Sequence, residues 1–104
     1  MSILHIAAFR WKPEVTPAEV AELTTALYDM AAEISEVRSY IAGENLRVRP
    51  SDTDFGVAAI VDDAAALEAY LDHPAHKAVY ERHLGRMIAE RTAMQLSIAE
   101  GVLA

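Results

Sequence analysis

The segment SILHIAAFRW, residues 2–11, decides the fold because its pattern is that of a strand with apolar side chains on both faces. Successive side chains of a strand point to opposite faces of the sheet. One face carries Ile3, His5, Ala7, Phe9 and Trp11, and the other carries Leu4, Ile6, Ala8 and Arg10. Both faces of the sheet around this strand must therefore be covered, and Pro13 ends the strand because proline cannot donate to a sheet ladder.

Three further segments have the character of strands. Residues 37–48 (VRSYIAGENLRV) are predicted as the second strand, with a bulge at Gly43, and the Pro- and Asp-containing segment 49–54 is predicted as a turn. Residues 55–61 (FGVAAIV) repeat the two-sided apolar pattern. Residues 91–103 (RTAMQLSIAEGVL) are predicted as the last strand. One face of this last strand carries Met94, Leu96 and Ile98.

Residues 16–34 (TPAEVAELTTALYDMAAEI) are predicted to form a helix. Thr16 is a good N-cap, Pro17 occupies the first helical position, and Glu19 completes a capping box with Thr16. Apolar residues follow at the spacing of one helical face, which is expected to pack on the sheet. This face comprises Val20, Leu23, Leu27, Ala31 and Ile34.

The second helical region is predicted to be broken by a proline. Residues 64–71 (AAALEAYL) form its first piece, after the capping residues Asp62 and Asp63. Pro74 ends this piece, because proline lacks the backbone N–H that a helix interior needs. Proline does fit the first turn of a new helix, so a second piece is expected to begin at this point.

The second piece begins with a cap provided by Asp72 or His73 and runs to about Leu84, with Gly85 predicted as its C-terminal stop. The break changes the direction of the chain. His73 is therefore expected to be a cap or a surface residue, whereas His76 can turn inward toward the sheet.

The order β-α-β-β-α-β predicts an α+β protein with a ferredoxin-like fold, in which both helices cover one face of a four-stranded antiparallel sheet. Residues 1–104 are expected to form a single domain. The uncovered face of the sheet would expose an apolar patch, which is unusual on a monomer. We therefore expect a homodimer whose two sheets pack face to face. This patch comprises Leu4, Ile6, Ala8, Ala58 and Ile60.

Composition excludes several classes of function. The formal net charge of −7 argues against binding to nucleic acid, although late arginines such as Arg82, Arg86 and Arg91 leave a small anionic ligand open beside the simpler interpretation of solvated surface charge. No apolar run approaches the roughly 20 residues that cross a bilayer. The N-terminal residues do not resemble a signal peptide, and cysteine is absent. A cytoplasmic protein without membrane association is expected.

Candidate chemistry centres on the segment DHPAHKAVY, residues 72–80, and on Tyr70 just before it. Tyr70 and His76 belong to the broken helix, which must pack over the sheet face that carries His5. Histidine exchanges protons near neutral pH. A tyrosine hydroxyl can position a carbonyl group or stabilise an enolate oxygen. The same residues could instead be hydrogen-bonded parts of the core.

A metal site is not predicted. His73 and His76 are three residues apart, but Pro74 lies between them and no third ligand stands at a motif spacing. His83 is expected to be exposed and without a partner. Nucleophilic catalysis lacks support, because the chain has no cysteine and no serine in an elbow or triad signature.

Three segments, HIAAFRWKPEVT, VRSYIAGENL and ALEAYLDHPAHKAV, resemble the stress-responsive A/B barrel (Dabb) family. The resemblance extends from His5 to the last strand and implies a homodimeric α+β barrel without a cofactor. One plant branch of this family consists of polyketide cyclases that act by aldol condensation. By resemblance, His76 is the base, Tyr70 assists it and His5 lines the pocket. Phe55 stands where that branch has a further histidine, which implies a different or drier pocket.

These observations favour a cofactor-independent cyclase, lyase or isomerase that uses His76 and Tyr70 on a small hydrophobic carbonyl or aromatic compound. Two alternatives stay open: a non-catalytic, stress-responsive small-molecule binder, and a structural dimer without a pocket. A cavity of about 300 Å³ or more between sheet and helices would favour a ligand site. The residues expected to bind substrate are His5, Ala7, Phe9, Leu27, Phe55 and Val57.

Overall fold

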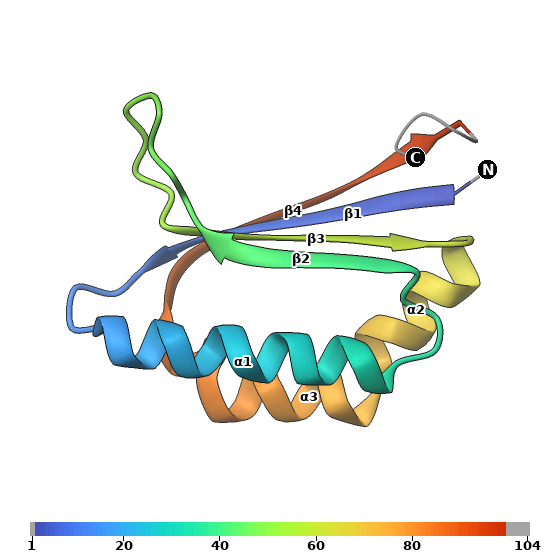
Figure 1. The fold of residues 1–104 in the computed structure, drawn as a ribbon, viewed down its shortest axis with the longest axis horizontal. Helices are drawn as coiled ribbons and strands as arrows, with labels where there is room; N and C mark the ends of the chain where they lie inside the picture. Colours follow the sequence, from blue (N-terminus) through green and yellow to red (C-terminus); the bar gives the residue numbers. More distant parts are fainter. Residues whose placement is uncertain (1, 100–104) are drawn as a thin grey trace.

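The computed structural model describes residues 2–99 and has the predicted architecture, a four-stranded antiparallel sheet with all helices on one face (Figure 1). The strand order in the sheet is β2-β3-β1-β4. The strands are β1 (Ser2–Trp11), β2 (Ser39–Glu44), β3 (Phe55–Val61) and β4 (Ile88–Ile98). The helices are α1 (Pro17–Glu33), α2 (Ala64–Asp72), α3 (Pro74–Val79), the π-helical turn η1 (Tyr80–Leu84) and α4 (Gly85–Met87).

Strand β1 lies inside the sheet and pairs with both β3 and β4. As predicted, alternate residues of β1 lie on opposite faces of the sheet. His5, Ala7 and Phe9 are buried toward the helices, whereas the intervening residues are half-buried on the opposite face. The register places His5 opposite Ala59 on β3 and opposite Gln95 on β4. The buried face of the sheet therefore carries histidine at its centre.

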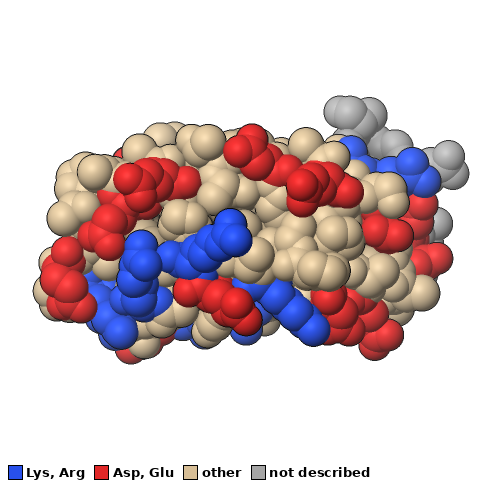
Figure 2. Space-filling view, turned by 90° about the horizontal axis from the view of Figure 1, so that it is seen from below, with Lys and Arg blue, Asp and Glu red and all other residues tan. Residues whose placement is uncertain are grey.

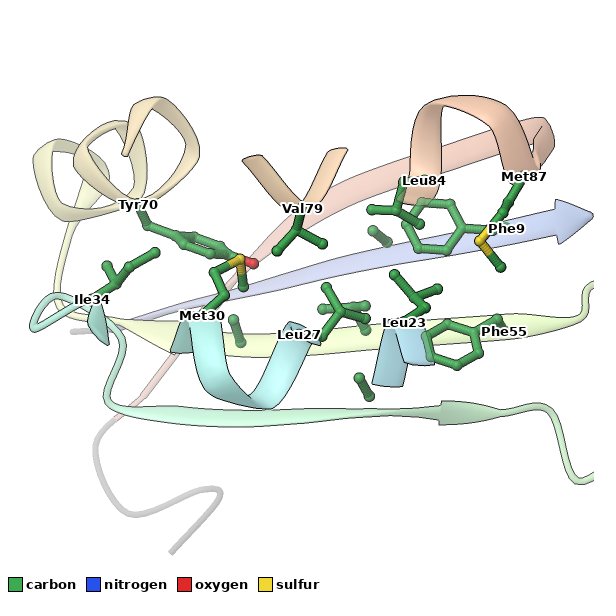
Figure 3. Close-up of a cluster of buried hydrophobic side chains, with 14 of the residues drawn as sticks. Phe9, Leu23, Leu27, Met30, Ile34, Phe55, Tyr70, Val79, Leu84 and Met87 are labelled. Carbon is green, nitrogen blue, oxygen red and sulfur yellow. The ribbon is translucent and has the colours of Figure 1, made fainter. Parts of the chain in front are cut away.

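Helix α1 begins as the sequence predicts. The Thr16 side chain accepts a hydrogen bond from the Glu19 backbone N–H, and the Glu19 side chain accepts one from the Thr16 backbone N–H, so the capping box is complete. The predicted apolar face is largely correct, except that Met30 is buried and Ala31 is only partly buried. Its side chains meet those of the sheet and of α2 to α4 in one core layer (Figure 3).

The helix break at Pro74 is present, and His73 rather than Asp72 caps the second piece. Nδ1 of His73 accepts a hydrogen bond from the Ala75 backbone N–H at 3.0 Å. Asp63 caps α2 by accepting from the Ala66 backbone N–H at 2.8 Å. The predicted capping role of Asp62 is wrong, because its carboxylate instead pairs with Arg38 at 2.7 Å on the surface.

Gly85 does not end the helix, contrary to the sequence prediction. Its backbone is right-handed helical, and the chain continues as α4 to Met87. The absence of a side chain at Gly85 instead lets the Tyr80 carbonyl oxygen come close, because a Cβ atom at this position would lie 3.1 Å from that oxygen. That oxygen also accepts the Gly85 backbone N–H, five residues further on, as a π-helical turn requires.

Two strands differ from their predicted bounds. β2 covers Ser39–Glu44 rather than 37–48, and Arg47, with a φ of 49°, lies in the turn that follows. The predicted bulge at Gly43 is absent, because Gly43 pairs in unbroken register with Gly56. β4 begins at Ile88 rather than at residue 91. Residues 100–103 of the predicted last strand lie outside the described residues.

One hydroxyl group binds the free edge of β2. The Tyr28 hydroxyl, on α1, donates a hydrogen bond to the Ala42 carbonyl oxygen at 3.2 Å and accepts one from the Ala42 N–H at 3.1 Å. The ring of Tyr28 also meets that of Tyr40 edge to face, with centroids 5.8 Å apart. Helix α1 is thus tied to the outermost strand through both its core face and this single side chain.

The outer face of the sheet is apolar and uncovered by any described helix (Figure 1). Ile41, Met94 and Leu96 are 64%, 48% and 42% exposed there. All of β4 between its first and last residues is exposed. Two hollows, of about 500 and 310 Å³, lie on this same face. These features agree with the predicted packing of two sheets.

The helix face of the molecule is charged. Lysine and arginine side chains are interspersed there with aspartate and glutamate, without a continuous basic surface in this view (Figure 2). Within residues 2–99, no helix combines the length and the apolar character that crossing a bilayer requires.

Candidate functional site

Five elements bring polar side chains to one small cavity between the sheet and the helices. β1 supplies His5, β2 supplies Tyr40, α2 supplies Tyr70, α3 supplies His76 and β4 supplies Arg91. These residues are as far as 86 positions apart in sequence, between His5 and Arg91. The fold therefore creates this cluster, and the remaining wall of the cavity is aliphatic or aromatic. Its other lining residues are Ala7, Phe9, Leu27, Val57, Tyr80 and Leu84.

His5 is the buried polar residue of the described core, with 3% of its surface exposed. The Gln95 Nε2 amide group donates a hydrogen bond to its Nδ1 at 3.0 Å. Nδ1 is then the acceptor, so the ring proton of neutral His5 is on Nε2. Burial, followed by the positive charge of Arg91 and by His76, lowers the pKa of His5 below the ordinary value of 6.5. His5 is consequently a neutral donor through Nε2 at pH 7.

Tyr70 lies between the two imidazole rings. Its ring centroid is 6.1 Å from that of His5 and 5.2 Å from that of His76, and both pairs meet at 78°. The ring extends from α2 into the layer between the helices and the sheet (Figure 3). The break at Pro74 makes this possible, because it lets α3 turn His76 toward a side chain of the preceding helix.

His76 is half-buried and is also held neutral at pH 7. Burial lowers its pKa below 6.5 and the charge of Arg91 lowers it further, while the Leu71 backbone and Asp72 oppose the shift. A neutral imidazole at an accessible cavity can accept a proton. Tyr70 stays protonated, because burial raises the pKa of its hydroxyl above 10.0. The pair therefore combines a base with a hydrogen-bond donor.

Tyr40 is a member of the site that the sequence did not suggest. Its hydroxyl oxygen is buried and has no hydrogen-bond partner among the described residues. Burial and the neighbouring Tyr70 raise the pKa of this hydroxyl strongly. The strand register contained the relevant signal, because Tyr40 pairs with Ala59, which also pairs with His5. A buried, unsatisfied hydroxyl is costly, and it is available to a polar group that enters the cavity.

The cavity is small. Its volume is about 40 Å³, which is room for a few water molecules and well below the roughly 300–1,000 Å³ of ordinary ligand pockets. The cavity therefore does not reach the volume of about 300 Å³ that the sequence analysis set for a ligand site. A larger groove of about 230 Å³ lies between α1 and α3, away from His5 and Tyr70.

The structure brings together seven of the eight residues that the sequence suggested for the site. The exception is Phe55, which is fully buried but does not line the cavity. Its ring packs on Trp11 at 5.5 Å and on Phe9 at 6.5 Å. The lining residues that the sequence did not assign to the site are Tyr40, Tyr80, Leu84 and Arg91.

The remaining histidines have other surroundings. His73 uses its Nδ1 as a helix cap, and His83 lines the groove between α1 and α3. Within residues 2–99, no three histidine or acidic side chains are grouped in a way that could hold a metal ion.

The sheet order, the antiparallel pairing and the one-sided helices define a ferredoxin-like α+β protein. The sequence model of the Stress Responsive A/B Barrel Domain family, Dabb, matches residues 3–98, and the chain therefore belongs to this family. The family membership suggested by the sequence is thus confirmed.

Relatives of the chain share its fold more clearly than any one activity. An uncharacterized protein of Streptomyces coelicolor is 35% identical over 78 residues, which are 73% of this chain and 80% of that protein. The crystal structure of a dimeric ferredoxin-like protein of unknown function from Thermobifida fusca has 39% identity and a TM-score of 0.87, covering 94% of this chain and 92% of its own. Other ferredoxin-like neighbours are also described as dimeric, which supports the predicted homodimer.

One structural neighbour carries the name of an enzyme. Hydroxynitrile lyase from Passiflora edulis has a TM-score of 0.82 and 12% identity to this chain, with coverage of 95% of this chain and 94% of the lyase. At this identity the likeness establishes the shared fold alone. It demonstrates that a chain with this fold can be an enzyme.

Proposed function

We propose that this protein is a cofactor-independent enzyme that moves a proton on a small carbonyl compound, as a cyclase, lyase or isomerase of the aldol type does. The observation that carries the proposal is the contact between a half-buried, neutral His76 and the protonated Tyr70 at the wall of one cavity. A base beside a hydrogen-bond donor is the pair that enolate chemistry requires.

The proposed reaction assigns a role to each group. His76 accepts a proton from the carbon next to the carbonyl group, and the electron pair of the broken C–H bond moves toward the carbonyl oxygen. The Tyr70 hydroxyl donates a hydrogen bond to the enolate oxygen that forms. In an addition, the enolate carbon then attacks a second carbonyl carbon, and the new alkoxide takes the proton back from His76. The lyase direction reverses these steps.

His5 supports the site through its neutral Nε2–H group, since its Nδ1 is occupied by Gln95. The Nε2–H group of His5 can donate a hydrogen bond to the substrate. It does not compete with His76 for the substrate proton. The small cavity limits the part of the substrate that is enclosed to the carbonyl group and its neighbouring carbons. The rest of the substrate would lie at the mouth of the cavity.

The test is proton exchange rather than turnover of an unknown substrate. Incubation with a panel of methyl ketones and 1,3-diketones in D2O, followed by proton NMR, reports exchange of the hydrogens next to the carbonyl. We expect the wild type to accelerate exchange, and His76→Gln to reduce the acceleration by about 10²–10⁴-fold, as loss of a general base does. His83→Gln is the matched control, because His83 lies in the groove between α1 and α3. Equal acceleration by wild type and His76→Gln would refute the role of His76.

The second candidate is a non-catalytic binder of a small flat compound. The observation that favours it is the set of four aromatic side chains, Phe9, Tyr40, Tyr70 and Tyr80, around a cavity with little free volume. A ketone that raises the melting temperature but undergoes no exchange with the wild type would support binding over catalysis.

A further inference from the structure

Among the described residues, Arg91 is the one that lines the cavity and carries a permanent charge, in a chain whose net charge is −7. It lies on β4 opposite Phe9, on the sheet face that meets the helices. No aspartate or glutamate of residues 2–99 lines the cavity. The site is therefore locally positive although the protein as a whole is acidic.

Arg91 also has no ion-pair partner among the described residues. The four ion pairs of residues 2–99 involve Arg10, Arg38, Arg47 and Arg86, each with its own carboxylate. Glu90, the acidic neighbour of Arg91 in sequence, pairs with Arg10 at 2.8 Å. The guanidinium group of Arg91 is thus free to bind an anion. Four of the other six arginines are instead paired with a carboxylate.

The charge of Arg91 acts on the cavity itself. It is among the causes that lower the pKa values of both His5 and His76. Its position near both imidazole rings places an anion bound by Arg91 at the same cavity as the proposed base. Arginine suits this task, because its planar fork binds a carboxylate through two parallel hydrogen bonds.

We infer that the cavity recognises a small oxo acid, with the carboxylate of the ligand held by Arg91 and its ketone oxygen facing the Tyr70 hydroxyl. The assignment of Tyr70 rests on the proposed function, whereas the binding of the carboxylate by Arg91 stands on the cavity and its charge. Arg91 would then be the residue that selects charged over neutral carbonyl compounds.

The test compares two probes of similar shape and different charge, acetoacetate and pentane-2,4-dione, by NMR titration at neutral pH. We expect the wild type to bind acetoacetate about 10–100-fold more tightly, the range of one charge-assisted hydrogen-bonded contact. By weakening the binding of acetoacetate, Arg91→Met should remove this preference. Arg91→Lys, which keeps the charge but not the fork, should retain part of it. Arg86→Met is the control, because Arg86 pairs with Glu19 on the surface.

Equal affinity of the wild type for the two probes, or an unchanged preference in Arg91→Met, would overturn the inference. Deuterium exchange in the dione separates this result from the proposed function. If deuterium exchange depends on His76 but the wild type shows no preference for the carboxylate probe, the role of Arg91 is refuted and the acid–base function is kept. If the preference for acetoacetate depends on Arg91 but no deuterium exchange occurs, the carboxylate site is kept and the catalytic function is refuted.

Discussion

His5 and His76 illustrate how neighbours decide the chemistry of a single residue. His5 is buried and His76 is half-buried, and each experiences the positive charge of Arg91. Both effects disfavour the charged imidazolium form, so the pKa of each ring lies below that of a free histidine. The hydrogen bond from Gln95 additionally fixes the position of the proton on His5. Two residues of the same type thus become a fixed donor and a candidate base.

The lowered pKa values predict a pH-dependent stability. Unfolded histidines take up protons as the pH falls below about 6.5, whereas the folded rings do so only at lower pH. The stability these neutral rings contribute is therefore present above pH 6.5 and is lost as the pH falls toward the folded pKa values. We expect the free energy of unfolding to fall by at most about 1.4 kcal/mol per pH unit for each histidine. Urea titrations between pH 7.5 and 5 measure this slope.

The variant His5→Gln/His76→Gln is the comparison for this measurement. Its unfolding free energy should vary less over the same interval, because two groups whose protonation disfavours the folded state have been removed. A slope identical to that of the wild type would show that other groups cause the pH dependence. Proton NMR titration of the two imidazole rings in the wild type provides a direct check, with midpoints expected below 6.5.

Site residues that follow from the alternation of side chains along a single strand could be assigned from the sequence. Site residues whose position depends on how two strands pair in the sheet could not. His5, Ala7 and Phe9 follow from the period of a strand. Tyr40 and Arg91 reach the cavity only because β2 and β4 pair in a particular register on either side of β3 and β1. Register is set by contacts across the whole sheet, which a single segment does not contain.

At the scale of elements, the helical region after β3 shows how one local signal can have two meanings. Glycine after a helical segment usually marks its end. Here Gly85 continues the helix through a π-helical turn, because its missing side chain lets the Tyr80 carbonyl oxygen approach. The structure confirms the effects predicted for Pro74 and Thr16, because these effects depend only on the chain within one turn.

Substitution of Gly85 tests this explanation. Gly85→Ala should destabilise the protein by about 1–2 kcal/mol, because the added methyl group meets backbone that cannot move aside easily. The gain in helix propensity from alanine, about 1 kcal/mol, opposes part of the cost. Glu81→Ala is the control, since Glu81 is an exposed residue of the same π-helical turn. Chemical denaturation gives both values, and an increase in stability for Gly85→Ala would contradict the explanation.

At the scale of the whole molecule, the outer face of the sheet leaves apolar side chains of the single chain exposed to water. Exposed apolar side chains on β2 and β4 lie on the same face as the half-buried residues of β1 and β3. A second copy packed on this face would remove them from water, which is the largest favourable term in association. The related dimeric structures agree with this arrangement.

A charge placed on this face should separate the two copies. In Leu96→Glu, a carboxylate replaces a side chain that is 42% exposed in the single chain, so the fold of one chain should tolerate it. Burial of that carboxylate between two sheets would be costly, and the variant should sediment as a monomer at concentrations where the wild type is a dimer. Ala69→Glu, on the exposed surface of α2, is the control and should leave the dimer intact. A dimeric Leu96→Glu protein would require a different interface.

The hydrogen bonds between Tyr28 and Ala42 have a consequence beyond the attachment of α1 to the sheet. An outermost strand normally offers its backbone groups to any extended chain that passes, which is how ordered aggregates begin. Here both backbone groups of Ala42 are engaged by the hydroxyl of Tyr28, so a foreign strand would have to displace this partly exposed side chain from both hydrogen bonds before it could align. The protein therefore carries, in a single tyrosine, a local barrier against growth of its sheet into a fibril.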